Sequence, residues 1–218
     1  MQLDNSKSPS SQYVLLGDVV GSREITDRDG FRKQLRDTRQ TVSESHEDSF
    51  AAPLSALKGI DEIGAVLTSV EHLYNIVVAL TARLRPHSIR LAVASGEIEF
   101  GADDQDVSQM DGEAFHRATE LLKSIERTGL QFDLDTGMAP LDTAVADEIN
   151  LLLHLRESWT DRQRDVVELY ERTGNQQAVA DDLDVSQQAV SNALRGASWP
   201  LAETIETRLR RTLEAYGR

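Results

Sequence analysis

The sequence has no cysteine among its 218 residues, which excludes disulfide bonds, a thiol nucleophile and every metal site built from thiolates. Aromatic residues make up only 5%, and no apolar run approaches the roughly 18 residues that a membrane-spanning helix needs. The opening residues, MQLDNSKSPSSQ, lack the apolar core of a secretory signal peptide. We therefore expect a soluble, cytoplasmic protein that has no membrane partner.

Lysine is also rare, because only Lys7, Lys33, Lys58 and Lys123 stand among the 23 basic residues, against 37 acidic residues. The formal net charge of -14 argues against nonspecific attraction to nucleic acid or anionic lipid. An acid-rich, lysine-poor surface is typical of halophilic proteins, since concentrated salt screens the repulsion between their acidic side chains. The alternative is an ordinary acidic cytosolic protein.

The charge is unevenly distributed along the chain. Residues 151–218 carry 9 basic and 11 acidic side chains, whereas residues 1–150 carry 14 and 26. This difference indicates two parts with different roles. We predict a disordered tail over 1–11, an α+β domain over 12–139, a connecting helix over 140–158, a helix-turn-helix domain over 159–200 and a C-terminal helix over 201–218.

Hydrophobic patterning predicts alternating strands and helices in the first part. Residues 13–20 form an apolar run closed by Gly21, which indicates a buried strand with Asp18 near its end. The next patterns predict a helix from Thr26, two strands joined by a turn at 58–62, and a helix that begins at Ser69 and is stopped by Pro86. Residues 89–100 predict a long strand or a bent hairpin with its kink at Gly96. A polar loop at 103–111, a helix over 113–128 and a strand at 130–135 follow.

This order begins with a split, ferredoxin-like βαββαβ arrangement, in which the first strand lies beside the third. Asp18 and Asp61 would then meet at one edge of the sheet. Two carboxylates suit Mg2+, which takes substrate phosphates among its remaining ligands, and Glu62 would add a third oxygen. The alternative is that Asp18 caps the turn after its strand and that Asp61 and Glu62 are ordinary polar residues of a hairpin turn.

The segments GDVVGSREITDR, RLAVASGEI and DGEAFHRATELL, with the Asp61-Glu62 turn, resemble the SatD family over about residues 13–128. More distantly, the order of elements is similar to class III nucleotide cyclases and GGDEF domains. That resemblance implies a cyclase-like fold in which Asp18 and Asp61 hold the metal ions. Where cyclases carry an Asn and then an Arg, this sequence has His116 and Glu120, and a glutamate cannot stabilise a transferring phosphoryl group. Cyclase activity is therefore not expected.

The same motifs supply candidate ligands for an anion: Ser22 and Arg23 in the first segment, and His116 and Arg117 in the last. A His-Arg pair at the start of a helix suits an anion, because free backbone N–H groups assist the two side chains. Alternatively, His116 is a partly buried structural histidine and Arg117 pairs with a neighbouring carboxylate.

The second part carries a strong helix-turn-helix pattern in QQAVADDLDVSQQAVSNAL, preceded by the capped segment SWTDRQRDVVELYERTG. It resembles the helix-turn-helix of sigma-70 region four and of LuxR-type regulators. The polar face of the second helix consists of Ser186, Gln187, Gln188, Ser191, Asn192 and Arg195. Gln and Asn can each form two hydrogen bonds with adenine, and Arg can form two with guanine. This face therefore predicts recognition of bases in the major groove of DNA. The alternative is a trihelical protein-interaction module, which the acidic Asp181 and Asp182 would suit.

The last helix carries an apolar stripe of Ile205, Leu209, Leu213 and Tyr216, which would either join a homodimer or pack on its own chain. The sequence as a whole predicts a DNA-binding transcriptional regulator whose first domain senses a nucleotide or a metal or drives assembly. The competing hypotheses are a metal-dependent nucleotide-processing enzyme localised by its helix-turn-helix, and a scaffold whose two parts both bind protein.

Overall fold

The computed structural model describes residues 12–57, 59, 61–99 and 106–216, so the predicted tail over 1–11 lies outside the described residues. The chain divides into two compact units, which are unit 1 (Met1–Asp147 and Thr212–Arg218) and unit 2 (Glu148–Arg211). The two boundaries fall inside helices α4 (Ala139–Glu157) and α8 (Trp199–Ala215). None of the described helices is long and apolar enough to cross a membrane.

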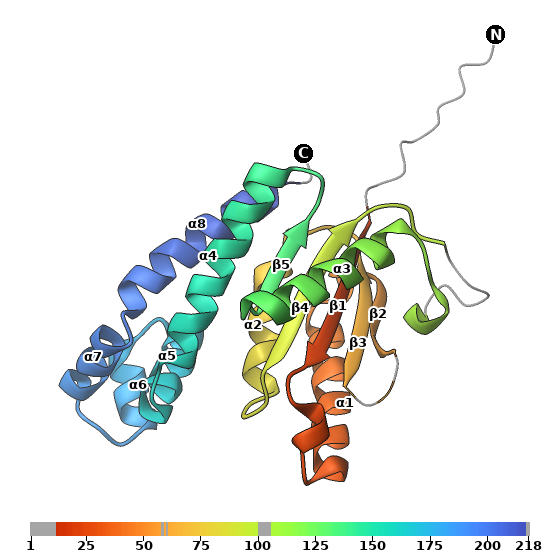
Figure 1. Cartoon of the computed structure of the whole chain (residues 1–218). Coiled ribbons are helices and arrows are strands. Elements are labelled where there is room, and N and C mark those ends of the chain that lie inside the picture. The colour runs from red at the N-terminus through yellow and green to blue at the C-terminus, as the bar shows by residue number, and fades with distance from the viewer. Residues whose placement is uncertain (1–11, 58, 60, 100–105, 217–218) are drawn as a thin grey trace. The chain divides into compact units, whose positions relative to one another are not determined.

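Unit 1 is built on a five-stranded sheet with strand order β2-β3-β1-β4-β5 (Figure 1). The strands are β1 (Tyr13–Val19), β2 (Phe50–Ala56), β3 (Glu62–Leu67), β4 (Ile89–Ser95) and β5 (Phe132–Asp135). β1 pairs antiparallel with both β3 and β4, and β5 joins β4 in parallel. The predicted mixed α+β order and the position of the first strand beside the third are confirmed.

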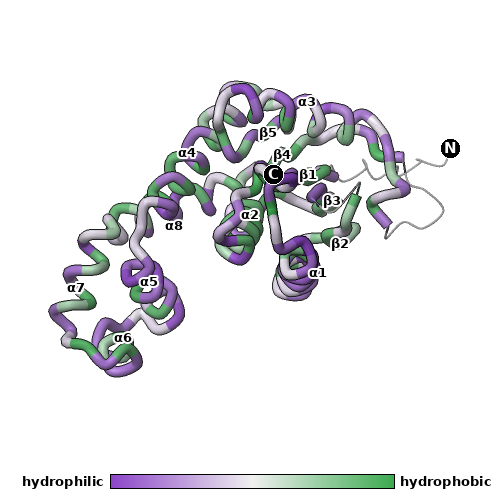
Figure 2. The backbone as a smooth tube through the Cα atoms, turned by 60° about the horizontal axis from the view of Figure 1, so that its bottom comes forward, coloured by the Kyte–Doolittle hydropathy of each residue, from purple (hydrophilic) through white to green (hydrophobic). Residues whose placement is uncertain are grey.

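Three helices cover this sheet: α1 (Arg28–Ser45), α2 (Leu73–Arg83) and α3 (Glu113–Thr128). α1 and α2 lie on one face and α3 lies on the other (Figures 1 and 2). Because strand residues alternate between faces, Val14 and Leu16 of β1 point toward α3 and pack in one core cluster with Ala114 and Phe115. Asp18 is the next residue of β1 on that face.

Two helices begin later than the sequence pattern predicts. α1 begins at Arg28 rather than Thr26, because the side chain of Asp27 accepts a hydrogen bond from the backbone N–H of Gly30 at 2.9 Å and caps the helix. α2 begins at Leu73 rather than Ser69, since the residues before it form a turn in which the Leu73 N–H bonds the Val70 carbonyl. α3 has the predicted bounds, with Gly129 in the left-handed conformation at its end.

The predicted polar loop at 103–111 is partly wrong. Residues 100–105 lie outside the described residues, but Val107 to Gln109 form a 3-10 turn and Val107 and Met110 are buried in the core on the α3 side. Residues 89–100 were predicted as a long strand or a bent hairpin, and the strand in this segment ends at Ser95, just before the predicted kink. A Cβ at Gly96 would lie 2.9 Å from the backbone nitrogen of Ala114, so only glycine allows this close approach to α3.

Unit 2 contains the helices α5 (Asp161–Thr173), α6 (Gln176–Asp182) and α7 (Gln187–Gly196), together with parts of α4 and α8. Thr160 and Gln163 form a capping box at the start of α5, and Gly174 ends the helix in the left-handed conformation. The start and the end of α5 therefore agree with the sequence prediction.

A cationic side chain lies at the centre of unit 2. The Arg156 guanidinium stacks over the rings of Trp159 and Trp199, at 5.1 Å and 5.6 Å from their centroids. It also bonds the carboxylates of Glu206 at 2.9 Å and Glu171 at 2.7 Å. Glu206 is buried, so this cluster fixes α4, α5 and α8 to one another by charge as well as by apolar contact.

The apolar stripe on α8 is not an exposed dimer seam. Leu209 and Leu213 are 0% and 1% exposed in the single chain, and Tyr216 is also buried. Of the two alternatives for this stripe, the structure shows packing within its own chain, and a homodimer stays a prediction.

Candidate functional site

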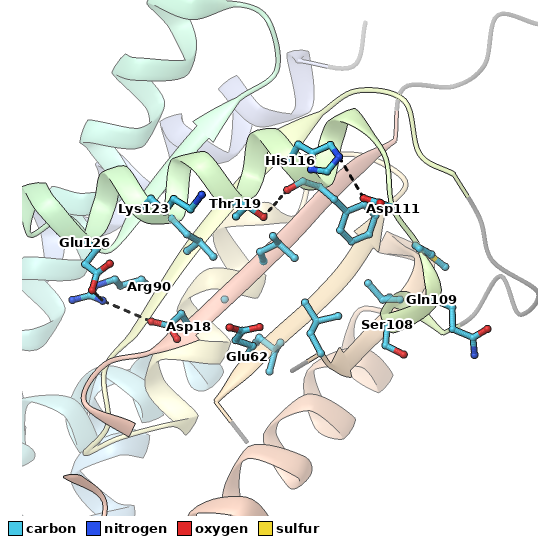
Figure 3. A pocket seen from close by; sticks show the side chains of 18 residues that line it. Asp18, Glu62, Arg90, Ser108, Gln109, Asp111, His116, Thr119, Lys123 and Glu126 are labelled. Atoms are coloured by element: carbon cyan, nitrogen blue, oxygen red, sulfur yellow. Dashed lines mark hydrogen bonds and ion pairs between the residues drawn. The ribbon is translucent and has the colours of Figure 1, made fainter. Parts of the chain in front are cut away.

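Unit 1 contains a cavity of about 760 Å3 on the α3 side of the sheet. Its wall comes from the ends of β1, β3 and β4, from one side of α3 and from the turn at 107–110 (Figure 3). A cavity of this size is within the range of pockets that bind small molecules.

A row of three charged residues closes one end of the cavity. Glu62, Asp18 and Arg90 are direct neighbours across β3, β1 and β4, because Asp18 pairs with Glu62 in one ladder and with Arg90 in the other. Directly opposed residues of antiparallel strands point to the same face, so all three side chains line the cavity (Figure 3). The Arg90 guanidinium lies 3.7 Å from the Asp18 carboxylate and 4.0 Å from that of Glu126 on α3.

The wall opposite this sheet face is a polar stripe of α3. His116, Thr119, Lys123 and Glu126 are spaced three, four and three residues apart, which places them on one side of a helix. His116 lies 3.6 Å from Asp111, at the end of the cavity away from Asp18 (Figure 3). Lys123 donates to Glu120 at 2.7 Å on the exposed surface of the helix.

The middle of the cavity is apolar. It is lined by Leu16, Leu57, Val107, Met110, Phe115 and Leu122. Leu16 is flanked across the sheet by Gly64 and Ala92, and these small residues leave space above the strands. A Cβ on Gly64 would lie 2.8 Å from the Leu57 side chain, so Leu57 rests over the position where a side chain is missing.

Burial raises the pKa of Asp18 above its ordinary value, and the nearby carboxylate of Asp61 raises it further. Arg90 acts in the opposite direction, while Glu62 and Glu126 add smaller increases. The ionised carboxylate of Asp18 therefore costs folding free energy and is stabilised by any cation that enters the cavity.

The predicted metal set of Asp18, Asp61 and Glu62 does not converge on one point. Across the described residues no group of three or more His, Cys, Asp or Glu side chains is arranged to hold a metal ion. Asp61 lies near Asp18, but it accepts a hydrogen bond from the Ser22 hydroxyl at 2.5 Å and does not line the cavity. Because neighbouring strand residues alternate in direction, Glu62 rather than Asp61 shares the cavity with Asp18. The three residues are therefore not grouped as a metal site, and binding of Mg2+ by the pair of Asp18 and Asp61 stays a prediction.

The four predicted anion ligands are dispersed. Ser22 is occupied by Asp61, Arg23 is exposed in the turn after β1, and only His116 lines the cavity. Arg117 forms a bidentate ion pair with Asp135 and donates a hydrogen bond to the Ser95 carbonyl at 2.7 Å. These contacts connect α3 to β4 and β5. The bond to Asp135 raises the pKa of Arg117, which is consistent with a structural cation.

Sequence reasoning missed Arg90, Lys123 and Glu126. The signal for the last two was available, since both continue the helical stripe that begins at His116. Arg90 carried no such signal, because its place beside Asp18 follows from the register between β1 and β4. That register forms between strands about 70 residues apart in the chain.

A second candidate surface lies on α7 of unit 2. Ser186 caps the helix by accepting from the Ala189 N–H, and Asp184 in the preceding turn adopts a left-handed conformation. Gln187, Gln188, Asn192 and Arg195 are exposed, whereas Ser191 is half-buried and Val190 is buried. The Asn192 carbonyl oxygen accepts from Gln188 at 3.2 Å and from Arg195 at 2.5 Å.

The geometry defines an α+β protein with a ligand-sized cavity in its sheet unit and an all-helical second unit. The family model for SatD matches residues 13–208, and the chain belongs to the SatD family. The resemblance noted in the sequence ended near residue 128, whereas the match extends into α8. Most of unit 2 is therefore part of what the family shares rather than a separate fusion.

Two solved structures show weak likeness. A bacterial light-regulated adenylyl cyclase matches with a TM-score of 0.43 and 10% identity, over 57% of this chain and 42% of that chain. A regulator of polyketide synthase expression from Bifidobacterium adolescentis matches with a TM-score of 0.30 and 14% identity, over 98% of this chain and 82% of that chain. Comparison with curated proteins gives no match. The structural likenesses are too low to support an argument about function.

Proposed function

We propose that the protein is a sequence-specific DNA-binding regulator in which α5, α6 and α7 form a helix-turn-helix and α7 enters the major groove. In this proposal unit 1 is a sensor or assembly domain. The observation that carries the proposal is the exposed polar face of α7, where Gln188, Asn192 and Arg195 succeed one another at helical spacing.

The contacts within this face support base reading. Gln188 and Arg195 both donate to the Asn192 carbonyl oxygen, so the three side chains are ordered before any DNA arrives. Pre-ordering reduces the entropy that side chains lose on binding. Amide groups suit adenine and a guanidinium suits guanine, so the face has a definite hydrogen-bonding pattern for the major groove.

The charge pattern gives a second support. The stretch 185–202 contains no Asp or Glu, although the whole chain has 37 acidic residues and a net charge of -14. An acid-free stretch in so acidic a chain reduces repulsion from DNA phosphates along α7 itself. Asp181 and Asp182 on α6 are exposed, so few phosphate contacts are expected and binding should depend only weakly on salt.

The proposal is tested by selecting bound fragments from genomic DNA at high potassium chloride. We expect the wild-type protein to enrich a shared sequence motif. Asn192→Ala and Arg195→Ala should each weaken binding to that motif by roughly 1 to 3 kcal/mol without loss of folded structure. Arg36→Ala is the matched control, because Arg36 is an exposed arginine on α1 of unit 1.

Two outcomes would overturn the proposal. In one, the wild-type protein enriches no motif at any salt concentration. In the other, the α7 variants enrich the motif as well as Arg36→Ala does. Protein capture by unit 2 would then be the better explanation of its exposed polar face.

A further inference from the structure

The cavity of unit 1 has carboxylates at both of its ends. Asp18 and Glu62 stand at the edge of the sheet, and Glu126 approaches them from α3 (Figure 3). Asp111 stands at the opposite end, beside His116 and near Ser108 and Gln109 of the 3-10 turn. The apolar residues around Leu16 and Phe115 separate the two ends.

The charges of the lining do not balance. Asp18, Glu62, Asp111 and Glu126 contribute four carboxylates, whereas Arg90 and Lys123 contribute two permanent cations. Arg90 is shared between Asp18 and Glu126, and Lys123 is paired with Glu120 outside the cavity. No ion pair to Glu62 is formed by any residue that the structure describes. Among the residues that the structure describes, the lining therefore has a surplus of negative charge.

This surplus decides the class of ligand. A phosphate-bearing ligand would meet like charge at both ends, and the cations that might receive it already have partners. A ligand with positive charge at both ends would meet opposite charge at both, and its middle would have to be apolar to replace water over Leu16, Met110 and Phe115. Aliphatic chains with ammonium groups at their ends have this pattern.

We propose that the cavity binds a linear aliphatic diamine or polyamine. One ammonium group lies between Asp18 and Glu62, the methylene chain crosses the apolar middle, and a second ammonium group lies beside Asp111. Ammonium groups donate three hydrogen bonds each, which Glu62, Asp111 and the polar residues of the 3-10 turn can accept. This proposal is independent of DNA binding by unit 2, because every residue that it uses belongs to unit 1.

The test is isothermal titration calorimetry with spermidine and with diaminoalkanes of increasing length, in the absence of DNA. Concentrated potassium chloride suppresses diffuse attraction between these cations and a chain of net charge -14. We expect saturable binding at one site, an optimum of affinity at one chain length, and at least tenfold weaker binding of the monoamine of the same length.

Three variants locate the site. Glu62→Gln and Asp111→Asn each remove one end charge with little change of shape, and each should weaken the optimal diamine at least tenfold. Thr119→Trp places a bulky ring over the apolar middle from the exposed side of α3 and should abolish binding of the long diamines. Circular dichroism and the melting temperature establish that each variant is folded.

Matched controls remove the same charge elsewhere in unit 1. Glu71 and Asp29 are exposed and do not line the cavity, so Glu71→Gln and Asp29→Asn should bind as the wild type does. The proposal fails if no saturable binding occurs, or if the controls weaken binding as much as the cavity variants do. It also fails if a magnesium nucleotide, but no diamine, binds in a manner that depends on Glu62. None of these results bears on motif selection by α7.

Discussion

The phenol of Tyr216 donates a hydrogen bond of 3.0 Å to the buried carboxylate of Asp142, which lies 74 residues earlier in the chain. Asp142 also accepts from the Thr136 N–H and from the Met138 N–H, both at 2.9 Å. This carboxylate therefore joins the end of α8, the start of α4 and the segment after β5 within unit 1.

Removing this hydroxyl should destabilise unit 1 modestly. Tyr216→Phe keeps the ring but removes one donor from Asp142, and the loss of a hydrogen bond to a charged group costs about 1.5 to 3 kcal/mol. Asp142→Ala should cost more, because it leaves the N–H groups of Thr136 and Met138 without their acceptor. Urea unfolding measures the free energy of unfolding of both variants. Equal stability of Tyr216→Phe and wild type would show that this hydrogen bond does not stabilise unit 1.

The same bond predicts a response to alkaline pH. Burial raises the pKa of Tyr216 above its ordinary value, and the hydrogen bond to Asp142 raises it further. A group whose pKa is higher in the folded state contributes stability that is complete below its unfolded pKa, about 10 for tyrosine. That stability is lost as pH rises through the folded value. The melting temperature should therefore fall above about pH 10, and Tyr216→Phe should fall less steeply.

Asp18 predicts a pH dependence of the same sign, but in the acid range. Its pKa is raised in the folded state, first by burial and then by Asp61, so the ionised form costs stability above the folded pKa. Asp18→Asn should raise the melting temperature at neutral pH. The difference from wild type should shrink as pH falls through the folded pKa of Asp18 and vanish near the unfolded pKa. A variant less stable than wild type at neutral pH would show that Asp18 is a structural residue held by Arg90.

The Arg156 cluster should be a main determinant of the stability of unit 2. Arg156→Met would remove the 2.8 Å contact between Arg156 and the buried carboxylate of Glu206, whereas the 3.2 Å contact between Glu206 and Arg210 would remain. Removing one partner of a buried pair costs roughly 3 to 5 kcal/mol, and the remaining contact places the expected loss at the lower end. Arg162→Met, at an exposed arginine of α5, is the control for denaturant unfolding and should change little.

Leu209→Glu distinguishes the internal packing of α8 from a dimer seam. Because Leu209 is buried within the single chain, a charge there should unfold unit 2 or lower its stability by several kcal/mol. A seam between subunits would instead give a folded monomer. Light scattering and circular dichroism separate these outcomes. Conversion of a wild-type dimer to a folded monomer would show that the α8 stripe is a contact surface between subunits.

Local signals decided which parts of the fold could be predicted. α3 was predicted with its bounds because Gly129 marks its end, and the start of α5 was predicted because a Ser/Thr cap precedes it. The positions of Asp61 and Glu62 could not be predicted, since a single residue of register decides which of them points into the cavity. The same limit concealed Arg90, whose partner is on another strand.

The burial of Val107 and Met110 was missed for a related reason. Each is a lone apolar residue in a polar segment, and such residues give no periodic signal. They enter the core because the turn at 107–109 folds them against β2 and α3, in a cluster that includes Ala52 and Phe115. The part of the cavity wall formed by Val107 and Met110 was therefore not predicted, because the sequence pattern indicated only a polar loop.

The division of the chain has a consequence for biosynthesis. All residues of unit 2 are contiguous, so the ribosome delivers them together and they can begin to fold as they emerge. Unit 1 needs residues from both sides of that insertion, and Tyr216 reaches Asp142 only after every residue of unit 2 has been translated. The part of the protein that is made first is thus the part completed last.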